Sequence, residues 1–252
     1  DILWASRTNA NAPFFQWEKS KLATPMTYEG APQCIRKGSD SADVFVFVRN
    51  NGTTQTDIMF MRDTHKNPSD AAVPILQTND FEDNPHVERI NTNTLVLFFD
   101  RDGDASNKPS DIFYSVSTDN GNSWQPVAKV QSVSTQYHDV QPHLYNDGSN
   151  WWMYYASADT LGSGKLSIFK AKQQTTNNWD SWGARQLVIG PGGITGGYGD
   201  MIAVGEPTLT QWGDLSFVVI YGNLSSGDTT DVLDCDPWLL SKKGSPLSIA
   251  NI

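Results

Sequence analysis

A proline-centred motif recurs four times along the chain and constrains the fold more than any other feature. Each copy has acidic or polar residues before the proline and an apolar run shortly after it. The motif prolines are Pro32, Pro85, Pro142 and Pro207, so successive copies are 53, 57 and 65 residues apart. Spacings of this size are typical of the four-stranded blades of β-propellers. The repeat therefore predicts an all-β chain built from blades.

Three strand-like runs follow the proline in each repeat. The first runs are residues 44–48, 95–99, 151–155 and 215–221. The second runs, most of which open with Asp, are 57–62, 111–114, 165–170 and 236–240. The third runs are 73–76, 126–130, 185–189 and 247–249. With the proline segment as the innermost strand, each repeat supplies the four strands of a blade.

The N-terminal residues begin in the middle of this pattern. Residues 1–7 look like the third strand of a blade and residues 15–22 like the fourth. Such a hairpin is the outer half of a blade whose inner strands lie elsewhere, so five blades of about 50 residues are predicted. Four blades plus an N-terminal hairpin is the alternative, because only four inner strand pairs are found. In both cases we expect a single β-propeller domain over residues 1–252.

The clearest local signal is the turn Ser-Thr-Asp-Asn-Gly-Asn-Ser-Trp at residues 117–124, between two strand-like runs. Asp119 can fold its carboxylate onto the N–H groups of its own turn, and Gly121 can take a positive φ. The turn resembles the Asp-box, Ser-x-Asp-x-Gly-x-Ser/Thr-Trp, of sialidases and other bacterial-neuraminidase-repeat propellers. That resemblance implies a turn on the side of the propeller away from the active site, so we interpret Asp119 and Trp124 as structural.

Charge and composition restrict the partners. The net charge of −10 disfavours nucleic acid and anionic membrane surfaces. Nine Trp and eight Tyr, with many Asn, Ser, Thr and Gly, suit stacking and hydrogen bonding with sugar rings. We therefore expect a monomer that acts on or binds an oligo- or polysaccharide. The first residues lack a basic n-region and no apolar run is long enough to span a membrane, so we expect a mature extracellular or periplasmic protein.

Acidic residues mark the starts of the innermost strands, which gather at one mouth of the central tunnel in a propeller. We predict four catalytic carboxyls at this mouth: Glu29, Asp83, Asp139 and Glu206. The predicted substrate-binding residues beside them are Tyr28, His138, Tyr198 and Asp200. Converging carboxyls raise one another's pKa, which suits a general acid and base for glycosidic bond cleavage. An Asp before a proline turn can instead simply cap a loop.

Residues 138–155 support a more specific hypothesis. They combine Asp139, Pro142, a turn and an aromatic strand that ends in Tyr154-Tyr155. The segment resembles blade openings in the five-bladed furanosidase-type glycoside hydrolases of families 32, 43, 62 and 117. The resemblance implies an acidic trio of base, acid and pKa-tuning residue.

Carried onto this sequence, the trio implies Asp83 or Glu29 as the base, Asp139 as the tuning residue and Glu206 as the acid. No Asp-Pro pair opens the first repeat, which departs from the family pattern. We expect a secreted glycoside hydrolase or a related carbohydrate-active enzyme. The alternative is a propeller that binds glycans or another protein without catalysis.

A sialidase is disfavoured in spite of the Asp-box. Sialidases resemble one another in an arginine triad that clamps the sugar carboxylate, whereas the seven arginines of this chain lie at none of the starts of the innermost strands, where the blades begin. An acidic mouth would also repel sialic acid.

No cofactor and no catalytic metal are expected. Asp100, Asp102 and Asp104 place oxygen atoms at alternate positions, as calcium loops do, so a structural Ca²⁺ competes here with a solvated Asp-rich turn. Cys34 and Cys235 lack metal-site spacing and form either one disulfide or two free thiols.

Overall fold

The computed structural model describes residues 2–5, 18–19, 27–36, 41–50, 52, 55–65, 72–102, 109–158, 165–190, 201–221, 234–241 and 246–248. All regular elements within these ranges are β-strands, so the prediction of an all-β chain is confirmed. No helix in this part of the chain has the length and hydropathy needed to cross a membrane.

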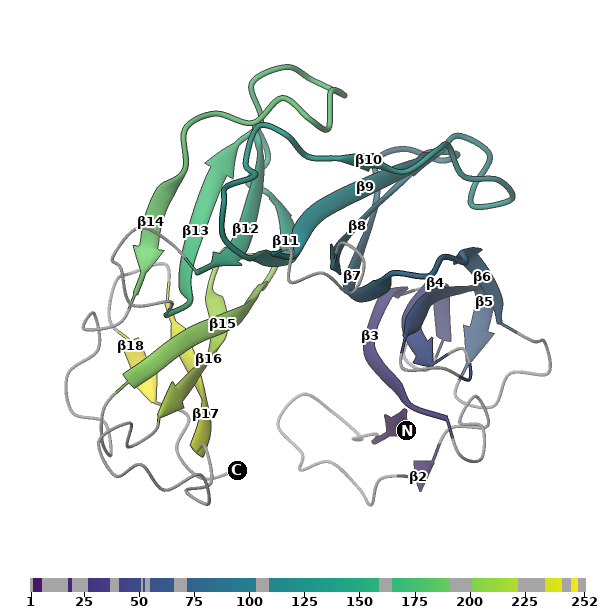
Figure 1. Cartoon of the computed structure of the whole chain (residues 1–252). Helices are drawn as coiled ribbons and strands as arrows, with labels where there is room; N and C mark the ends of the chain where they lie inside the picture. The colour runs from purple at the N-terminus through teal and green to yellow at the C-terminus, as the bar shows by residue number, and fades with distance from the viewer. Residues whose placement is uncertain are drawn as a thin grey trace. The chain divides into compact units, whose positions relative to one another are not determined.

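Four antiparallel sheets of four strands follow one another along the chain (Figure 1). The first contains β3 (Glu29–Arg36), β4 (Ser41–Asn50), β5 (Thr56–His65) and β6 (Val73–Leu76). The second contains β7 (Phe81–Arg89), β8 (Leu95–Asp102), β9 (Asp111–Ser117) and β10 (Ala128–Lys129). Each sheet starts at a motif proline, as the repeat predicts.

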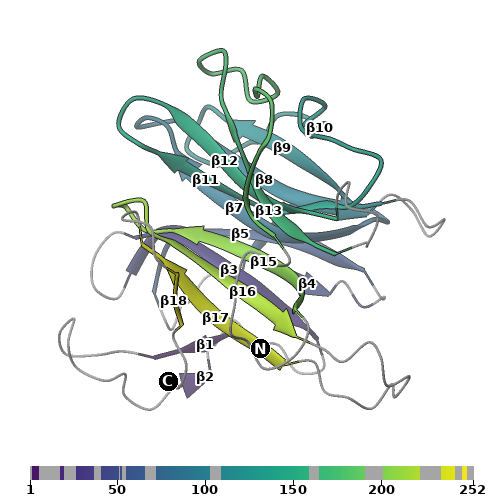
Figure 2. The ribbon, with the colours of Figure 1, turned by 90° about the vertical axis from the view of Figure 1, so that its left-hand side faces the viewer.

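The third and fourth sheets repeat this order. The third contains β11 (Asp139–Asn146), β12 (Trp151–Ser157), β13 (Ser167–Lys172) and β14 (Gln186–Ile189). The fourth contains β15 (Met201–Leu209), β16 (Leu215–Tyr221), β17 (Asp234–Leu240) and β18 (Pro246–Ser248). Figure 2 shows β15, β16, β17 and β18 side by side. Sheets of four sequential antiparallel strands are the blades of a β-propeller.

The preferred number of five blades is wrong, and the four-bladed alternative is confirmed for the residues described. The N-terminal segment forms β1 (Leu3–Trp4) and β2 (Glu18–Lys19), which pair antiparallel as a two-stranded sheet of their own. The hairpin was therefore recognised correctly, but no inner strand pair joins it within the described ranges.

The contacts divide the chain into two compact units. The first comprises Asp1–Lys108 and Ser115–Val127, and the second comprises Pro109–Tyr114 and Ala128–Ile252. The expectation of one domain over residues 1–252 stays a prediction.

Each unit has its own apolar core. In the first unit, β7 packs against β3, β4 and β5, and one buried cluster includes Phe45, Phe47, Met59 and Met61. In the second unit, β15 packs against β11, β12 and β13, and the cluster includes Val204, Phe217, Val219 and Trp238. Each side chain of this size contributes about 1.5–3 kcal/mol when fully buried. The cluster of the second unit also includes Ile168 and Ile189 of the third sheet, so it holds the third and fourth sheets together.

The turn between β9 and β10 has the contacts that its sequence predicts. Ser123 donates from its N–H and its hydroxyl to the two carboxylate oxygens of Asp119, at 2.9 and 2.6 Å. Gly121 has φ 84°, and Trp124 meets the ring of Phe60 edge-on at 5.7 Å. The hydrogen bonds from Ser123 lower the pKa of Asp119 to about 2, and the ring contact holds the turn against β5.

Candidate functional site

A distorted start is common to the four innermost strands β3, β7, β11 and β15. The residue before each motif proline has a positive φ although it is not glycine; these pre-proline residues are Ala31 (44°), Asn84 (49°), Gln141 (57°) and Glu206 (52°). The strand pairing shifts register at each of these places. A non-glycine residue at positive φ costs about 1–3 kcal/mol, and β-bulges are frequent beside active sites. Each bulge is therefore a candidate functional position within its own unit.

The residue three positions before each proline faces a cross-strand partner on the second strand of its sheet. The pairs are Glu29 with Arg49, Glu82 with Arg101, Asp139 with Ser157, and Val204 with Val219. Ionic partners thus occur in the first two sheets only, and the four positions are chemically different.

Glu29 and Glu82 belong to two copies of the same ion pair within the first unit. Arg49 Nε lies 3.3 Å from Glu29 Oε1, and Arg101 Nε lies 3.2 Å from Glu82 Oε1. Both carboxyl groups are buried, and each also accepts a hydrogen bond from a threonine, Thr27 or Thr78. Because two consecutive sheets repeat the arrangement, it supports a structural role for both glutamates, and the catalytic role of Glu29 stays a prediction.

Asp83 has a different environment in the first unit. Its side chain is half-buried, and its Oδ1 accepts a hydrogen bond from the N–H of Asn84 at 2.8 Å. Burial raises the pKa of Asp83, and the charge of Asp102 raises it further. Partial burial raises the pKa of Tyr28, which is 54% exposed, and the charge of Asp83 raises it further. A shared substrate site of Tyr28 and Asp83 stays a prediction.

Asp139 is the buried carboxyl of the second unit. Its Oδ2 accepts the N–H of Thr135 at 2.7 Å, and its own N–H donates to the carbonyl of Ser110 at 2.9 Å. Burial raises the pKa of Asp139, hydrogen bonds from Ser157 and Thr135 oppose the rise, and the charge of Asp111 adds to it.

His138 is exposed and, like Asp139, is held by a hydrogen bond with Ser110. The N–H of Ser110 donates to His138 Nδ1 at 3.0 Å. Ser110 therefore positions two neighbouring residues, both of which the sequence identified as candidates.

Glu206 lies on the fourth bulge, exposed to solvent, and is the one pre-proline residue with a carboxyl group. Its N–H donates to Gln141 Oε1 at 2.8 Å, so two pre-proline residues of adjacent sheets are joined directly. A second bond, from the N–H of Leu209 to His143 Nε2 at 3.1 Å, holds the same two strands.

Gln141 and His143 were missed as candidates because their role is to bridge strands that are 60 or more residues apart. The signal that could have found them is the alignment of the four motifs, in which they occupy the positions immediately before and after the proline.

Several sequence predictions remain open. Tyr198 and Asp200 lie outside the described residues, as does Asp104 of the possible calcium loop. Asp100 accepts a hydrogen bond from Asn84 at 3.0 Å. No group of three or more His, Cys, Asp or Glu able to hold a metal occurs in the part of the chain that is described. The gathering of Glu29 and Asp83 with Asp139 and Glu206 stays a prediction, because the two pairs lie in different units.

Comparisons with known proteins bear on the fold. No family model and no curated protein matches the sequence. Among solved structures, the catalytic domain of a GH62 α-L-arabinofuranosidase from Coprinopsis cinerea is similar over 91% of this chain and 78% of its own, with 12% identity and a TM-score of 0.59.

Two further structures are similar. A protein of unknown function from Dyadobacter fermentans matches over 90% of this chain and 74% of its own, with 11% identity and a TM-score of 0.54. An α-L-arabinofuranosidase from Lactobacillus brevis matches over 81% and 70%, with 11% identity and a TM-score of 0.50. At these identities the shared property is the fold, so the chain has the propeller fold that is found in furanosidase-type glycoside hydrolases.

Proposed function

We propose that this protein is a carbohydrate-active enzyme that hydrolyses glycosidic bonds of an oligo- or polysaccharide. The observation that carries the proposal is the fourfold bulge with non-glycine residues at positive φ. Strain that is kept in every blade, with a different side chain each time, favours one asymmetric centre over repeated identical lectin sites. The similarity in fold to glycoside hydrolases supports hydrolysis as the function, but the reaction is determined by the residues of the site and not by the fold.

The proposal gives the acid role to Glu206. Its exposed carboxyl can reach a glycosidic oxygen, and a sugar ring bound over it would exclude water from the site of proton transfer. The bond from the Glu206 N–H to Gln141 fixes the backbone that carries this carboxyl. The backbone of Glu206 is therefore held in place even though the residue is exposed in the free protein.

Asp83 and Asp139 take the complementary roles of base and orienting residue in the proposal. Asp83 accepts a hydrogen bond from the N–H of Asn84, and Asp139 accepts one from Thr135. These bonds oppose the rise in pKa that burial causes and so help to keep the ionised form that a base or an orienting residue needs. Glu29 stays a prediction as the base, although its ion pair with Arg49 supports a structural role.

The proposed substrate class is a neutral furanoside polymer. Two structural neighbours are named as α-L-arabinofuranosidases, and a chain with a net charge of −10 favours an uncharged polysaccharide over a polyanion. An extracellular or periplasmic location, where such polymers occur, and a monomeric state belong to the same proposal.

The test compares Glu206→Gln with the unchanged protein on two arabinofuranosides. One substrate has a sugar leaving group, which needs protonation, and the other has a 4-nitrophenolate leaving group, which does not. The activity of Glu206→Gln should fall by about 10² to 10⁴ on the first and much less on the second.

Glu88→Gln is the matched control, because Glu88 lies on β7 beyond the register shift, has no catalytic role in the proposal, and the change is chemically the same. Equal losses of Glu206→Gln on both substrates would reject the acid role.

Glycan binding without hydrolysis is the second candidate, and one observation favours it. Three of the four pre-proline residues, Ala31, Asn84 and Gln141, cannot ionise. Binding of arabinan or arabinoxylan by the unchanged protein, with no release of reducing ends, would support this candidate and reject hydrolysis.

A further inference from the structure

A polar pocket lies at the opposite end of the third sheet from Asp139. Asp139 pairs with Ser157 at one end of β11 and β12, and Asn146 pairs with Trp151 at the other end. The pocket has a volume of about 480 Å³ and lies between the β11–β12 turn and the segment after β13. None of the carboxyls considered above lines it, so it is separate from the proposed catalytic residues.

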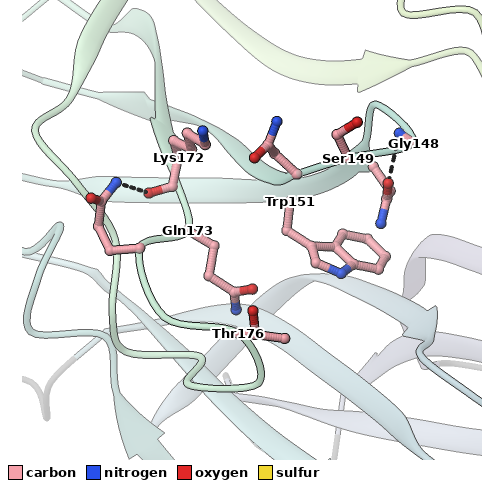
Figure 3. Close-up of a pocket in the computed structure, with 9 residues that line it drawn as sticks. Gly148, Ser149, Trp151, Lys172, Gln173 and Thr176 are labelled. Carbon is pink, nitrogen blue, oxygen red and sulfur yellow. Dashed lines mark hydrogen bonds between the residues drawn. The ribbon is translucent and has the colours of Figure 1, made fainter.

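Three lining residues form a row across the sheet. Asn146 pairs with Trp151, and the N–H of Gln173 donates to the carbonyl of Trp151 at 2.9 Å. Cross-strand neighbours direct their side chains to the same face. Figure 3 shows Trp151 and Gln173 on one side of their strands, with the Gln173 side chain pointing toward Thr176 and Lys172 directed away.

The indole of Trp151 is held in place by buried neighbours. Its ring meets that of Trp179 edge-on at 5.8 Å, and Trp179 and Trp182 are only 4% and 5% exposed. Trp182 Nε1 donates to the carbonyl of Trp179 at 2.7 Å, which fixes the pair. Trp151 itself is only partly buried, so a rigid aromatic surface is presented to the pocket.

The amide of Gln173 is fixed as well. Its Nε2 donates to the carbonyl of Asn178 at 3.3 Å, which leaves the amide oxygen as an acceptor for a ligand. Apart from Lys172 and Gly148, the other lining residues carry hydroxyl or amide groups, including Ser149, Asn150 and Gln174, and no carboxylate lines the pocket.

We propose that this pocket is a second carbohydrate-binding site, specific for a neutral oligosaccharide. The C–H face of a pyranose or furanose ring stacks on Trp151, and its hydroxyl groups bond to Gln173, Thr176 and Asn146. A drug-like apolar ligand would need a mostly hydrophobic lining, and a nucleic acid strand would need several cations. The site does not depend on hydrolysis, since none of its residues has a catalytic role in the proposed function.

The experiment uses calorimetric titration with neutral arabino-, xylo- and cello-oligosaccharides in a Glu206→Gln background, where substrate is not consumed. Trp151→Ala should weaken binding of at least one oligosaccharide by about tenfold or more. Gln173→Ala should weaken it by a smaller factor. Trp212→Ala is the matched control, because Trp212 is 68% exposed on the β15–β16 turn, outside the pocket. This variant should bind the oligosaccharides with unchanged affinity.

Trp151→Phe keeps the packing against Trp179 and guards against misfolding of the alanine variant. It should retain most of the binding if the aromatic surface is what matters. Equal affinity of Trp151→Ala and Trp212→Ala would overturn the proposal, and so would an absence of binding to the whole panel. Loss of hydrolysis in Glu206→Gln with binding at Trp151 intact would separate this site from the proposed catalytic one.

Discussion

Replacing Arg49 by Met tests the claim that Glu29 is a structural group. The Glu29 side chain is 0% exposed and that of Arg49 is 21% exposed. Arg49→Met keeps the length of the stem but leaves the carboxylate in the core with its arginine partner removed. Glu29→Gln instead keeps the shape of the site, and Arg49 can still reach solvent.

The two changes should therefore differ in size. Removing one partner of a buried ion pair costs about 3–5 kcal/mol, and we expect about 3 kcal/mol for Arg49→Met because the pair lies close to solvent. For a chain of this length that loss corresponds to a fall in Tm of about 6–12 °C. Glu29→Gln should cost about 1 kcal/mol, the typical net value of a hydrogen bond. The double variant should be more stable than Arg49→Met alone, because it buries no unpaired charge.

Urea unfolding followed by circular dichroism measures all three free energies, and hydrolysis assays on the same samples measure function. Glu29→Gln should retain the activity of the unchanged protein. The reasoning is refuted if Arg49→Met unfolds within about 0.5 kcal/mol of the unchanged protein. It is also refuted if Glu29→Gln keeps its stability but loses activity, since that result would return Glu29 to the role of base.

Three further predictions concern the β9–β10 turn and the pH dependence of activity. Gly121→Ala should destabilise the protein more than Gly148→Ala in thermal unfolding, because both glycines have positive φ but a Cβ at Gly121 would clash with the ring of Phe60, whereas one at Gly148 meets nothing within 4 Å. Equal losses would show that the contact with Phe60 is unimportant. The folded-state pKa of Asp119, about 2, is below the ordinary 3.8, so its stabilising contribution is present above pH 3.8 and is lost as the pH falls toward 2. Asp119→Asn should accordingly have a lower Tm than the unchanged protein at pH 5 and a similar one near pH 2, and a constant difference across this range would contradict the assignment. If ionised Asp139 is required, activity falls as the pH drops through its raised pKa, and Asp111→Asn should move that acid limb to lower pH because the Asp111 charge raises this pKa; an unmoved limb would exclude Asp139 as the group that titrates.

The sequence predicted the strands well because each is a short apolar run bounded by polar turns. All four motif prolines lie in innermost strands, and the predicted run 215–221 coincides with β16. The prediction of five blades was wrong for a physical reason. Leu3 pairs with Lys19 and Trp4 with Glu18, and such local pairing has the same pattern whether or not inner strands lie beside it.

The candidate site was only partly predictable. The positive φ of the pre-proline residues is imposed by the register shift in each sheet, and the residue types Ala, Asn, Gln and Glu do not signal it. The roles of Glu29 and Glu82 depend on arginines that become neighbours only through strand register. The row of Asn146, Trp151 and Gln173 likewise arises from pairing across three strands.

Time-resolved proton NMR of an arabinan oligosaccharide with the purified protein tests the proposed hydrolysis most directly. New anomeric signals of shortened products should appear with the unchanged protein and with Glu29→Gln. They should be about 10² to 10⁴ times slower with Glu206→Gln. Broadening of the substrate signals without any new anomeric signal would show binding alone and would contradict the proposal that this propeller is a hydrolase.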